Sequence, residues 1–227
     1  MAKKDNTKKK RKVGIFEDRK NYLIFCEGEK TEPDYFKGFK AEIDTNTVYK
    51  DLINIKCISP GKTTKELISY AKKYIKDNKI KGYDVWCVYD KDDFKSDDFD
   101  NAQTMCNSLN EKRGNSFNSA WSNQCFEYWY ILHFNYYDSN NHRAYYIDFL
   151  TKKFKKIGLN KYEKNNPDNY SIMKEYGNPK KAIGFAKRRI AECNNVSPSK
   201  CAPATTVYKL VEELSKYLPD EDKEKFI

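Results

Sequence analysis

The segment that decides the fold of this 227-residue chain is YDVWCVYDKDD, at residues 83–93. Its first seven residues, 83–89, carry the strongest strand pattern in the sequence and predict a strand buried on both faces. The run stops abruptly at three aspartates, Asp90, Asp92 and Asp93. We therefore expect a buried strand that brings a group of carboxylates to its carboxyl end.

A second segment, at residues 22–29, repeats this arrangement. Residues 22–26 form a short apolar run, which meets Glu27 and Glu29 directly. In a parallel sheet, side chains that leave the carboxyl ends of neighbouring strands converge on one crevice, where ligands gather. The two acidic groups are therefore expected to form a shared site if their strands are neighbours.

The rest of the first 135 residues alternates between strand and helix patterns. The predicted strands are 22–26, 52–58, 83–89 and 117–121, and the predicted helices are 31–43, 63–75, 99–109 and 125–134. Three helix starts carry capping signals: Thr31 with Asp34, Thr63 with Glu66, and the Ser-Asn pair at 122–123. This alternation predicts an α/β fold, in which a parallel sheet has helices on both faces.

The last third of the chain changes character after a polar turn. Helical patterns cover 145–154, 179–190 and 206–218, and no strand is predicted there. We expect a basic flexible tail at 1–19, an α/β core at 20–135, and a helical extension at 136–227 that packs on the core.

Composition restricts the class of protein. Apolar residues make up 39% of the chain and aromatic residues 15%, which is enough to form a core and excludes general disorder. No apolar stretch reaches the length of a membrane helix, about 18 residues, and no secretory leader is evident. The seven cysteines form no CxxC pair, which favours a reducing, cytoplasmic location.

The net charge of +10 is concentrated at one end of the sequence. Residues 1–12 contribute +6 of it, and 37 of the 43 basic residues are lysine. Such a tail is either a solvated segment or a weak electrostatic attachment to nucleic acid.

The acidic segments favour a hard cation. Crowded carboxylates cannot all stay ionised without a compensating charge, and oxygen ligands select Mg²⁺ or Mn²⁺. The predicted metal ligands are Glu27, Glu29, Asp90, Asp92 and Asp93. The alternative is that both strands end in water, where acidic residues are common.

Other reaction chemistries have less support. The two histidines, His133 and His142, cannot build a histidine-rich zinc site, and His133 lies in an aromatic segment typical of a core. No phosphate-binding loop of the GxxxxGK[ST] type is present. Cys26 and Cys87 lie in predicted buried strands next to acids, which is unfavourable for a nucleophilic thiolate.

Four segments together resemble one protein family. They are CEGEKTEPDYF at 26–36, YDKDD at 89–93, SNQCFEYW at 122–129 and PATTV at 203–207. The combination is similar to the RloB-type family, which includes the AbiLii abortive-infection proteins. The resemblance covers residues 20–135 well, and it implies a Toprim-like fold such as that of topoisomerases, primases and overcoming-lysogenization-defect nucleases.

The resemblance also implies roles for the acidic residues. Glu27 matches the glutamate of the Toprim pattern, and Asp90 with Asp92 matches its Asp-x-Asp pair, which together bind a divalent metal. Glu29 and Asp93 are extra acids, which either support these ligands or bind a second ion.

Further positions concern the same predicted site, some from the resemblance and some from their charge. Glu127 belongs to the family's Ser-Asn-x-x-Phe-Glu element and is expected to be a further acid of the site. Gln124 stands where proline is expected, a departure that concerns the turn. Lys30 is either a catalytic cation or a solvated lysine at a helix start, and the basic stretches 152–156 and 180–189 either follow a nucleic-acid backbone or are solvated faces.

Three function classes remain open. The first is a metal-dependent nuclease of phage defence, acting on RNA such as tRNA or on DNA, with an ABC-type ATPase partner implied by the resemblance. The second is a non-catalytic nucleic-acid-binding or adaptor subunit. The third, a haloacid dehalogenase-like phosphatase, is disfavoured because its Asp-x-Asp-Thr signature belongs after the first strand. The oligomeric state is left open.

Overall fold

The computed structural model describes residues 19–93, 95–110 and 114–227. The strands are β1 (Lys20–Cys26), β2 (Ile53–Ile58), β3 (Tyr83–Asp90), β4 (Ser116–Asn123) and β5 (Ala204–Thr205). The helices of the first half are α1 (Thr31–Ile43), α2 (Thr64–Asp77), α3 (Ser96–Asn110) and α4 (Glu127–Leu132). Those of the second half are α5 (Arg143–Lys156), α6 (Asn169–Tyr176), α7 (Pro179–Glu192), α8 (Val207–Ser215) and α9 (Asp220–Lys223), with a short 3-10 helix at Pro198–Lys200.

The strands form one mostly parallel sheet in the order β2-β1-β3-β4-β5. β1 to β4 run parallel, and β5 pairs antiparallel with β4. β1 and β3 are direct neighbours, with Cys26 opposite Val88. This pairing satisfies the condition for a shared acidic site, because the strands that end in Glu27 and Asp90 stop side by side.

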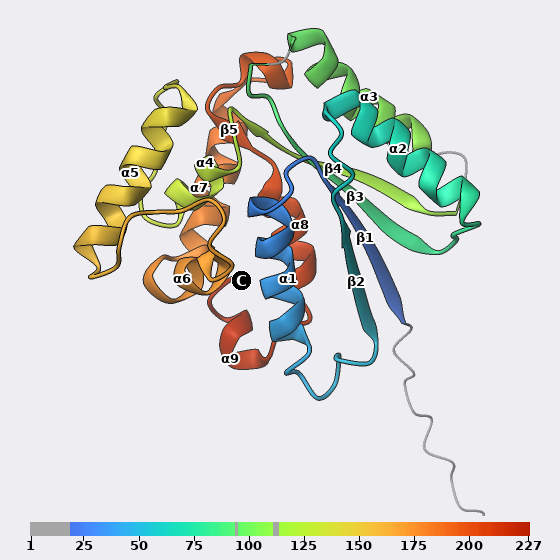
Figure 1. The fold of residues 1–227 in the computed structure, drawn as a ribbon, viewed down its shortest axis with the longest axis horizontal. Helices are drawn as coiled ribbons and strands as arrows, with labels where there is room; N and C mark the ends of the chain where they lie inside the picture. Colours follow the sequence, from blue (N-terminus) through green and yellow to red (C-terminus); the bar gives the residue numbers. More distant parts are fainter. Residues whose placement is uncertain (1–18, 94, 111–113) are drawn as a thin grey trace, which may run out of the picture.

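Helices cover both faces of the sheet (Figure 1). Alternate residues of β1 point to opposite faces, as the strand period of two requires. Leu23 and Phe25 pack with α2 and α3, whereas Tyr22 and Ile24 pack with helices of the opposite layer. The predicted α/β class is confirmed, with a Rossmann-like core.

The predicted helix starts are only partly correct. Thr63 and Glu66 form the expected capping box of α2. Thr31 does not cap α1, because Lys30 is the N-cap residue and Thr31 is already helical. The Thr31 hydroxyl instead donates to the carbonyl of Lys164, 3.3 Å away.

The Ser-Asn pair at 122–123 was predicted to cap a helix, and this prediction is wrong. Both residues are buried at the end of β4. The Asn123 side-chain amide donates to the carbonyls of Pro198 and Ser199, both at 3.0 Å, so it is engaged by a distant segment. The aromatic helix begins later and is shorter than expected.

The C-terminal extension, residues 136–227, contributes a strand to the sheet as well as helices. Its residues 204–205 form β5, and the Thr205 hydroxyl lies 3.0 Å from that of Ser122 on β4. Tyr22 of β1, Trp129 of α4 and Leu210 of α8 belong to the same apolar cluster. The helices α6 and α9 and the strand β5 were not predicted, because each is short and depends on contacts with distant segments.

Two further findings concern the expected location. Within the described part of the chain, none of the helices is long and apolar enough to cross a membrane. Cys193 and Cys201 form a disulfide, which the sequence did not predict, while five other cysteines are free thiols. The basic tail falls almost wholly in residues 1–18, outside the described residues.

Candidate active site

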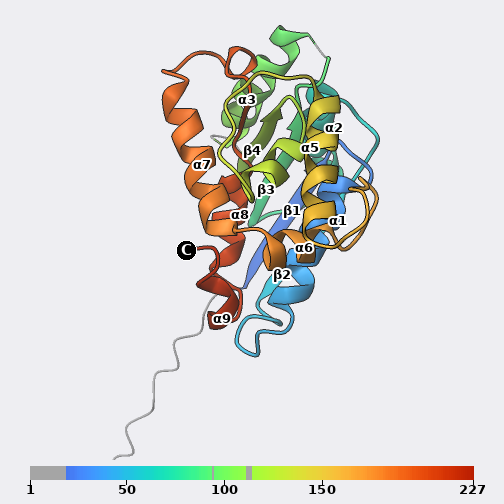
Figure 2. The same ribbon diagram turned by 90° about the vertical axis from the view of Figure 1, so that its left-hand side faces the viewer.

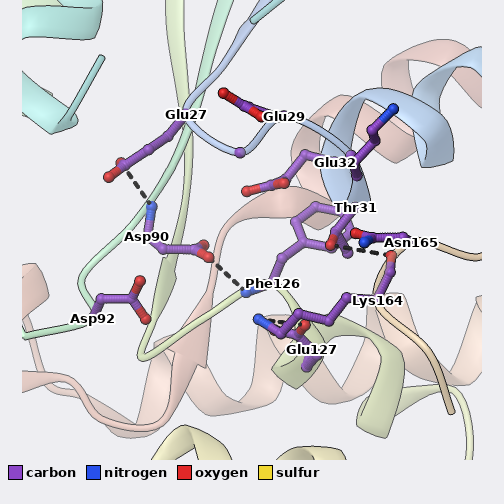
Figure 3. Close-up of a pocket in the computed structure, with 12 residues that line it drawn as sticks. Glu27, Glu29, Thr31, Glu32, Asp90, Asp92, Phe126, Glu127, Lys164 and Asn165 are labelled. Carbon is purple, nitrogen blue, oxygen red and sulfur yellow. Dashed lines mark hydrogen bonds and ion pairs between the residues drawn. The ribbon is translucent and has the colours of Figure 1, made fainter. Parts of the chain in front are cut away.

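A cavity of about 390 Å³ lies at the carboxyl ends of β1 and β3. Figure 3 shows carboxylates from both strands, from the start of α1 and from the start of α4 directed toward it. We call it the acidic pocket. Its lining consists of Glu27, Gly28, Glu29, Lys30, Thr31, Glu32, Asp90, Asp92, Phe126, Glu127, Lys164 and Asn165.

Glu27 and Asp90 are joined across the neighbouring strands. The backbone amide of Asp90 donates to Glu27 Oε2 at 3.4 Å, and the hydroxyl of Thr64 on α2 donates to the same oxygen at 3.5 Å. Asp90 Oδ2 accepts from the backbone amide of Phe126 at 3.0 Å. Two strands, α2 and the turn before α4 thus hold this pair of carboxylates.

The surroundings of these two carboxyl groups favour their neutral forms. Burial raises the pKa of Asp90 well above its usual range, and the charges of Glu32 and Asp92 add to the effect. Asp90 Oδ1 is buried and has no hydrogen-bond partner among the described residues. Burial also raises the pKa of Glu27 to about 7. The pKa values of the pair are therefore governed by burial and by neighbouring carboxylates.

Glu32 is a site residue that the sequence analysis missed. It is 4% exposed in the first turn of α1, and its carboxylate lies over Gly28, where a Cβ would meet Glu32 Oε2 at 2.0 Å. Burial, with the nearby charge of Glu127, raises the pKa of Glu32 to about 7. The signal available in the sequence was an acid in the first turn of the helix that follows Gly28.

Glu127 lies in the pocket wall, as the resemblance implied. It is 1% exposed at the start of α4. Its Oε1 lies 2.9 Å from Nζ of Lys164 and accepts from the hydroxyl of Tyr162 at 3.2 Å. Lys164 comes from the loop between α5 and α6, and no motif in the sequence pointed to it.

Of Asp92 and Asp93, only Asp92 lies in the acidic pocket. Asp92 lines the pocket with φ +38°, a left-handed conformation that aspartate tolerates better than most residues, and its Oδ1 lies 3.0 Å from Nη1 of Arg143. Asp93 is outside the pocket lining, its side chain is 75% exposed, and it lies 3.4 Å from the same guanidinium. Arg143, the first residue of α5, was not predicted as a site residue.

The remaining predicted residues lie at the rim or elsewhere. Glu29 and Lys30 line the pocket but are exposed. The basic stretches at 152–156 and 180–189 belong to α5 and α7 and do not line it. His133 is buried away from the pocket, and burial lowers its pKa to about 4, which agrees with the predicted core role.

The side chains of the acidic pocket fit a divalent cation only in part. Within residues 19–93, 95–110 and 114–227, no group of three acidic, histidine or cysteine side chains is arranged to hold a metal ion. The buried oxygen of Asp90 that has no hydrogen-bond partner among the described residues, and the pKa values raised by burial and by neighbouring carboxylates, are nevertheless what a bound cation would offset. The donor set therefore suits Mg²⁺ or Mn²⁺ by chemistry, and ligation requires the carboxylates to turn toward a common point.

These observations define an α/β protein with a Rossmann-like core and an acidic pocket at the carboxyl edge of its sheet. Residues 22–214 match the model of a family described as RloB-like protein. Because the match spans most of the chain, the chain belongs to the RloB-like family. No curated protein and no solved structure gives a significant match.

Proposed function

We propose that this RloB-like protein is a Toprim-type nuclease that depends on Mg²⁺ or Mn²⁺ and hydrolyses phosphodiester bonds of RNA or DNA. The observation that carries the proposal is the meeting of Glu27 and Asp90 on neighbouring strands, with one buried Asp90 oxygen left unpaired. Residues 26–36 and 89–93, which contain these acids, also carry the resemblance to the AbiLii proteins.

Glu27, Asp90 and Asp92 are the residues that would hold the cation. When bound, Mg²⁺ or Mn²⁺ supplies an activated water and stabilises negative charge on the scissile phosphate. Lys30 supplies a further positive charge at the rim, suited to hold a phosphate, whereas Lys164 inside the pocket is paired with Glu127.

Glu32 has the properties of a proton donor and acceptor. A group with a pKa near 7 can both bind and release a proton at neutral pH, which is what general acid–base catalysis requires. Its burial beside Gly28 keeps bulk water from that proton. In this role Glu32 protonates the oxygen that leaves the cleaved strand.

The biological role that we propose is abortive infection in the cytoplasm, with an ABC-type ATPase as the controlling partner. The support for both is the likeness to AbiLii proteins at 122–129 and 203–207. In this arrangement the ATPase decides when the nuclease acts.

The test is cleavage of labelled tRNA, single-stranded DNA and duplex DNA with Mn²⁺, with and without the product of the neighbouring gene. We expect cleavage by the wild type and its loss, by at least about a hundredfold, in Glu27→Gln and Asp90→Asn. Asp93→Asn is the matched control, because Asp93 lies outside the pocket and should retain activity. Equal cleavage by all four proteins would show that another site, or a contaminant, does the chemistry.

A non-catalytic adaptor is the second candidate, and two ion pairs favour it. Lys164 already neutralises Glu127, and Arg143 already neutralises Asp92, which reduces the need for a metal. An adaptor predicts that neither Mg²⁺ nor Mn²⁺ raises the melting temperature of the wild type. A nuclease predicts a rise in the wild type that is absent in Asp90→Asn.

A further inference from the structure

A second cavity, of about 420 Å³, lies along α5 and is separate from the acidic pocket. α5 and α7 stand on either side of α4 in the view of Figure 2. The cavity combines four aromatic rings with three lysines, namely Tyr136, Tyr137, Tyr145, Phe149, Lys152, Lys153 and Lys156. We call it the aromatic–lysine pocket.

Two rings of this pocket are stacked, and one of the two, Tyr145, is exposed. Tyr137 and Tyr145 are nearly parallel, with centroids 5.7 Å apart and planes 26° apart, and Tyr137 also packs with Phe149 at 6.2 Å. Tyr145 is 44% exposed, an unusual position for a large aromatic ring. Nearby Tyr136 is less available, because the guanidinium of Arg188 lies 4.1 Å from its ring centroid.

Positive charge is arranged along the same helix. Residues 143–156 contain five basic residues and one acidic residue, Asp148, which lies 3.0 Å from Nζ of Lys152. Nζ of Lys153 lies 5.4 Å from the ring centroid of Phe149, so cation and ring share one wall of the pocket. Lys156, near the other end of the pocket, is exposed.

We propose that the aromatic–lysine pocket binds an unpaired base of a single-stranded nucleic acid, with the lysines holding the adjacent phosphates. An aromatic ring can stack on the face of any base, but only when that base is not already stacked in a duplex. The inference rests on the proposed nuclease function for its choice of ligand and narrows the substrate to strands with unpaired nucleotides.

The position of α5 links this pocket to the acidic one. Arg143 begins α5 and pairs with Asp92, while Tyr145, two residues later, opens the aromatic–lysine pocket. A strand that reaches the acidic pocket past this end of α5 therefore meets the rings of Tyr145 and Tyr137. An acidic polypeptide would satisfy the lysines but would leave the exposed ring of Tyr145 without a stacking partner.

The experiment measures binding of the full chain to fluorescent oligothymidylate of about ten nucleotides, in EDTA so that no cleavage occurs. An abasic strand of the same length and a matched duplex serve as comparison ligands. We expect the abasic strand and the duplex to bind about tenfold more weakly than oligothymidylate at the same salt concentration.

Substitutions distinguish the contribution of base stacking to binding from the contribution of positive charge. Tyr145→Ala should weaken binding of oligothymidylate about tenfold and leave the abasic strand unchanged, whereas Tyr145→Phe should bind normally. Tyr176→Ala is the matched control, because Tyr176 lies on α6 outside the pocket and is 43% exposed. Replacing both Lys152 and Lys156 by alanine should weaken binding of both strands, because the phosphates are common to them.

Each outcome of these binding experiments either supports or overturns the proposal that the aromatic–lysine pocket binds an unpaired base. Equal affinity for oligothymidylate and the abasic strand overturns the inference, as does an equal effect of Tyr145→Ala and Tyr176→Ala. If polyglutamate binding depends on Tyr145 as strongly as oligothymidylate binding does, the pocket takes acidic polypeptide and the inference fails. Base-dependent binding without any cleavage in Mn²⁺ supports the inference and counts only against the nuclease proposal.

Discussion

The backbone amide of Asp90 and the carboxylate of Glu27 are hydrogen bonded across neighbouring strands, at 3.4 Å from N to Oε2. This contact exists because β1 and β3 pair in parallel with Cys26 opposite Val88, so that Glu27, directly after β1, lies beside the last residues of β3. Each strand then releases an acid into the same pocket. Burial raises the pKa of both carboxyl groups, which favours their neutral forms and so reduces the repulsion between them.

The first prediction concerns stability and pH. The pKa values of Glu27 and Glu32 rise from 4.5 to about 7 on folding, so the native state holds more protons than the unfolded state in this range. The free energy of unfolding should therefore fall as pH rises from 4.5 to above 7, by up to about 1.4 kcal/mol per pH unit for each carboxyl. Urea unfolding at pH 6, 7 and 8 without divalent ions measures this slope.

His133 acts in the opposite direction between about pH 4 and 6.5. The lowered pKa of His133 makes stability rise with pH between about 4 and 6.5, so the interval above pH 6.5 reports the carboxyl groups most directly. Glu27→Gln and Glu32→Gln should each flatten the slope there, and Mn²⁺ should restore stability at pH 8. A slope unchanged in both variants would contradict the burial of ionisable acids in the pocket.

The second prediction concerns the ion pair of Lys164 and Glu127. Glu127 is almost fully buried, so Lys164→Ala leaves an uncompensated carboxylate and should lower the free energy of unfolding by about 1–3 kcal/mol. Adding Glu127→Gln should recover most of that loss, because the buried charge is then removed. Lys161→Ala is the control in the same loop. Because the pair of Lys161 with Glu163 is exposed, this substitution should change the free energy of unfolding by less than about 0.5 kcal/mol. Purely additive losses in the double variant would show that the two side chains do not interact.

The third prediction compares two glycines. In Gly28→Ala the new methyl group would displace the carboxylate of Glu32, and in Gly184→Ala it would enter open space within α7. We expect Gly28→Ala to lower cleavage in Mn²⁺ by roughly a hundredfold while the protein stays folded, because the flexible Glu32 side chain can move aside but then leaves the position from which it would protonate the leaving oxygen. Gly184→Ala should raise the free energy of unfolding by about 0.5–1 kcal/mol, since alanine favours a helix interior. Thermal melts of both variants and a cleavage assay of Gly28→Ala in Mn²⁺ check the pair, and unaltered cleavage by Gly28→Ala would argue against a role for Glu32.

The fourth prediction concerns the cysteines. Cys193 and Cys201 are joined, with a sequence separation of eight residues, whereas Cys57 is a partly exposed free thiol. Alkylation of the unfolded, unreduced protein followed by peptide mass spectrometry should modify the five free thiols and leave Cys193 and Cys201 linked. Reduction should lower the free energy of unfolding by about 2–3 kcal/mol, as expected for a loop of this length. Alkylation of Cys193 without reductant would contradict the disulfide.

The sequence by itself determined the α/β class and most of the acidic pocket. Apolar runs that stop at Glu27 and Asp90 specify where two strands end, because a buried strand cannot continue through charged residues. The capping box of Thr63 and Glu66 could also be predicted from the sequence, because a capping box depends on residues only three positions apart.

Only the tertiary structure decided which charges meet. The pairing of Lys164 with Glu127 and of Arg143 with Asp92 depends on how the loop before α6 and the start of α5 pack against the sheet. The sequence placed Asp93 in the site, whereas the turn after β3 directs it outward. Contacts between residues far apart in the chain follow from the packing of whole elements, and no local pattern of hydrophobicity or charge encodes them.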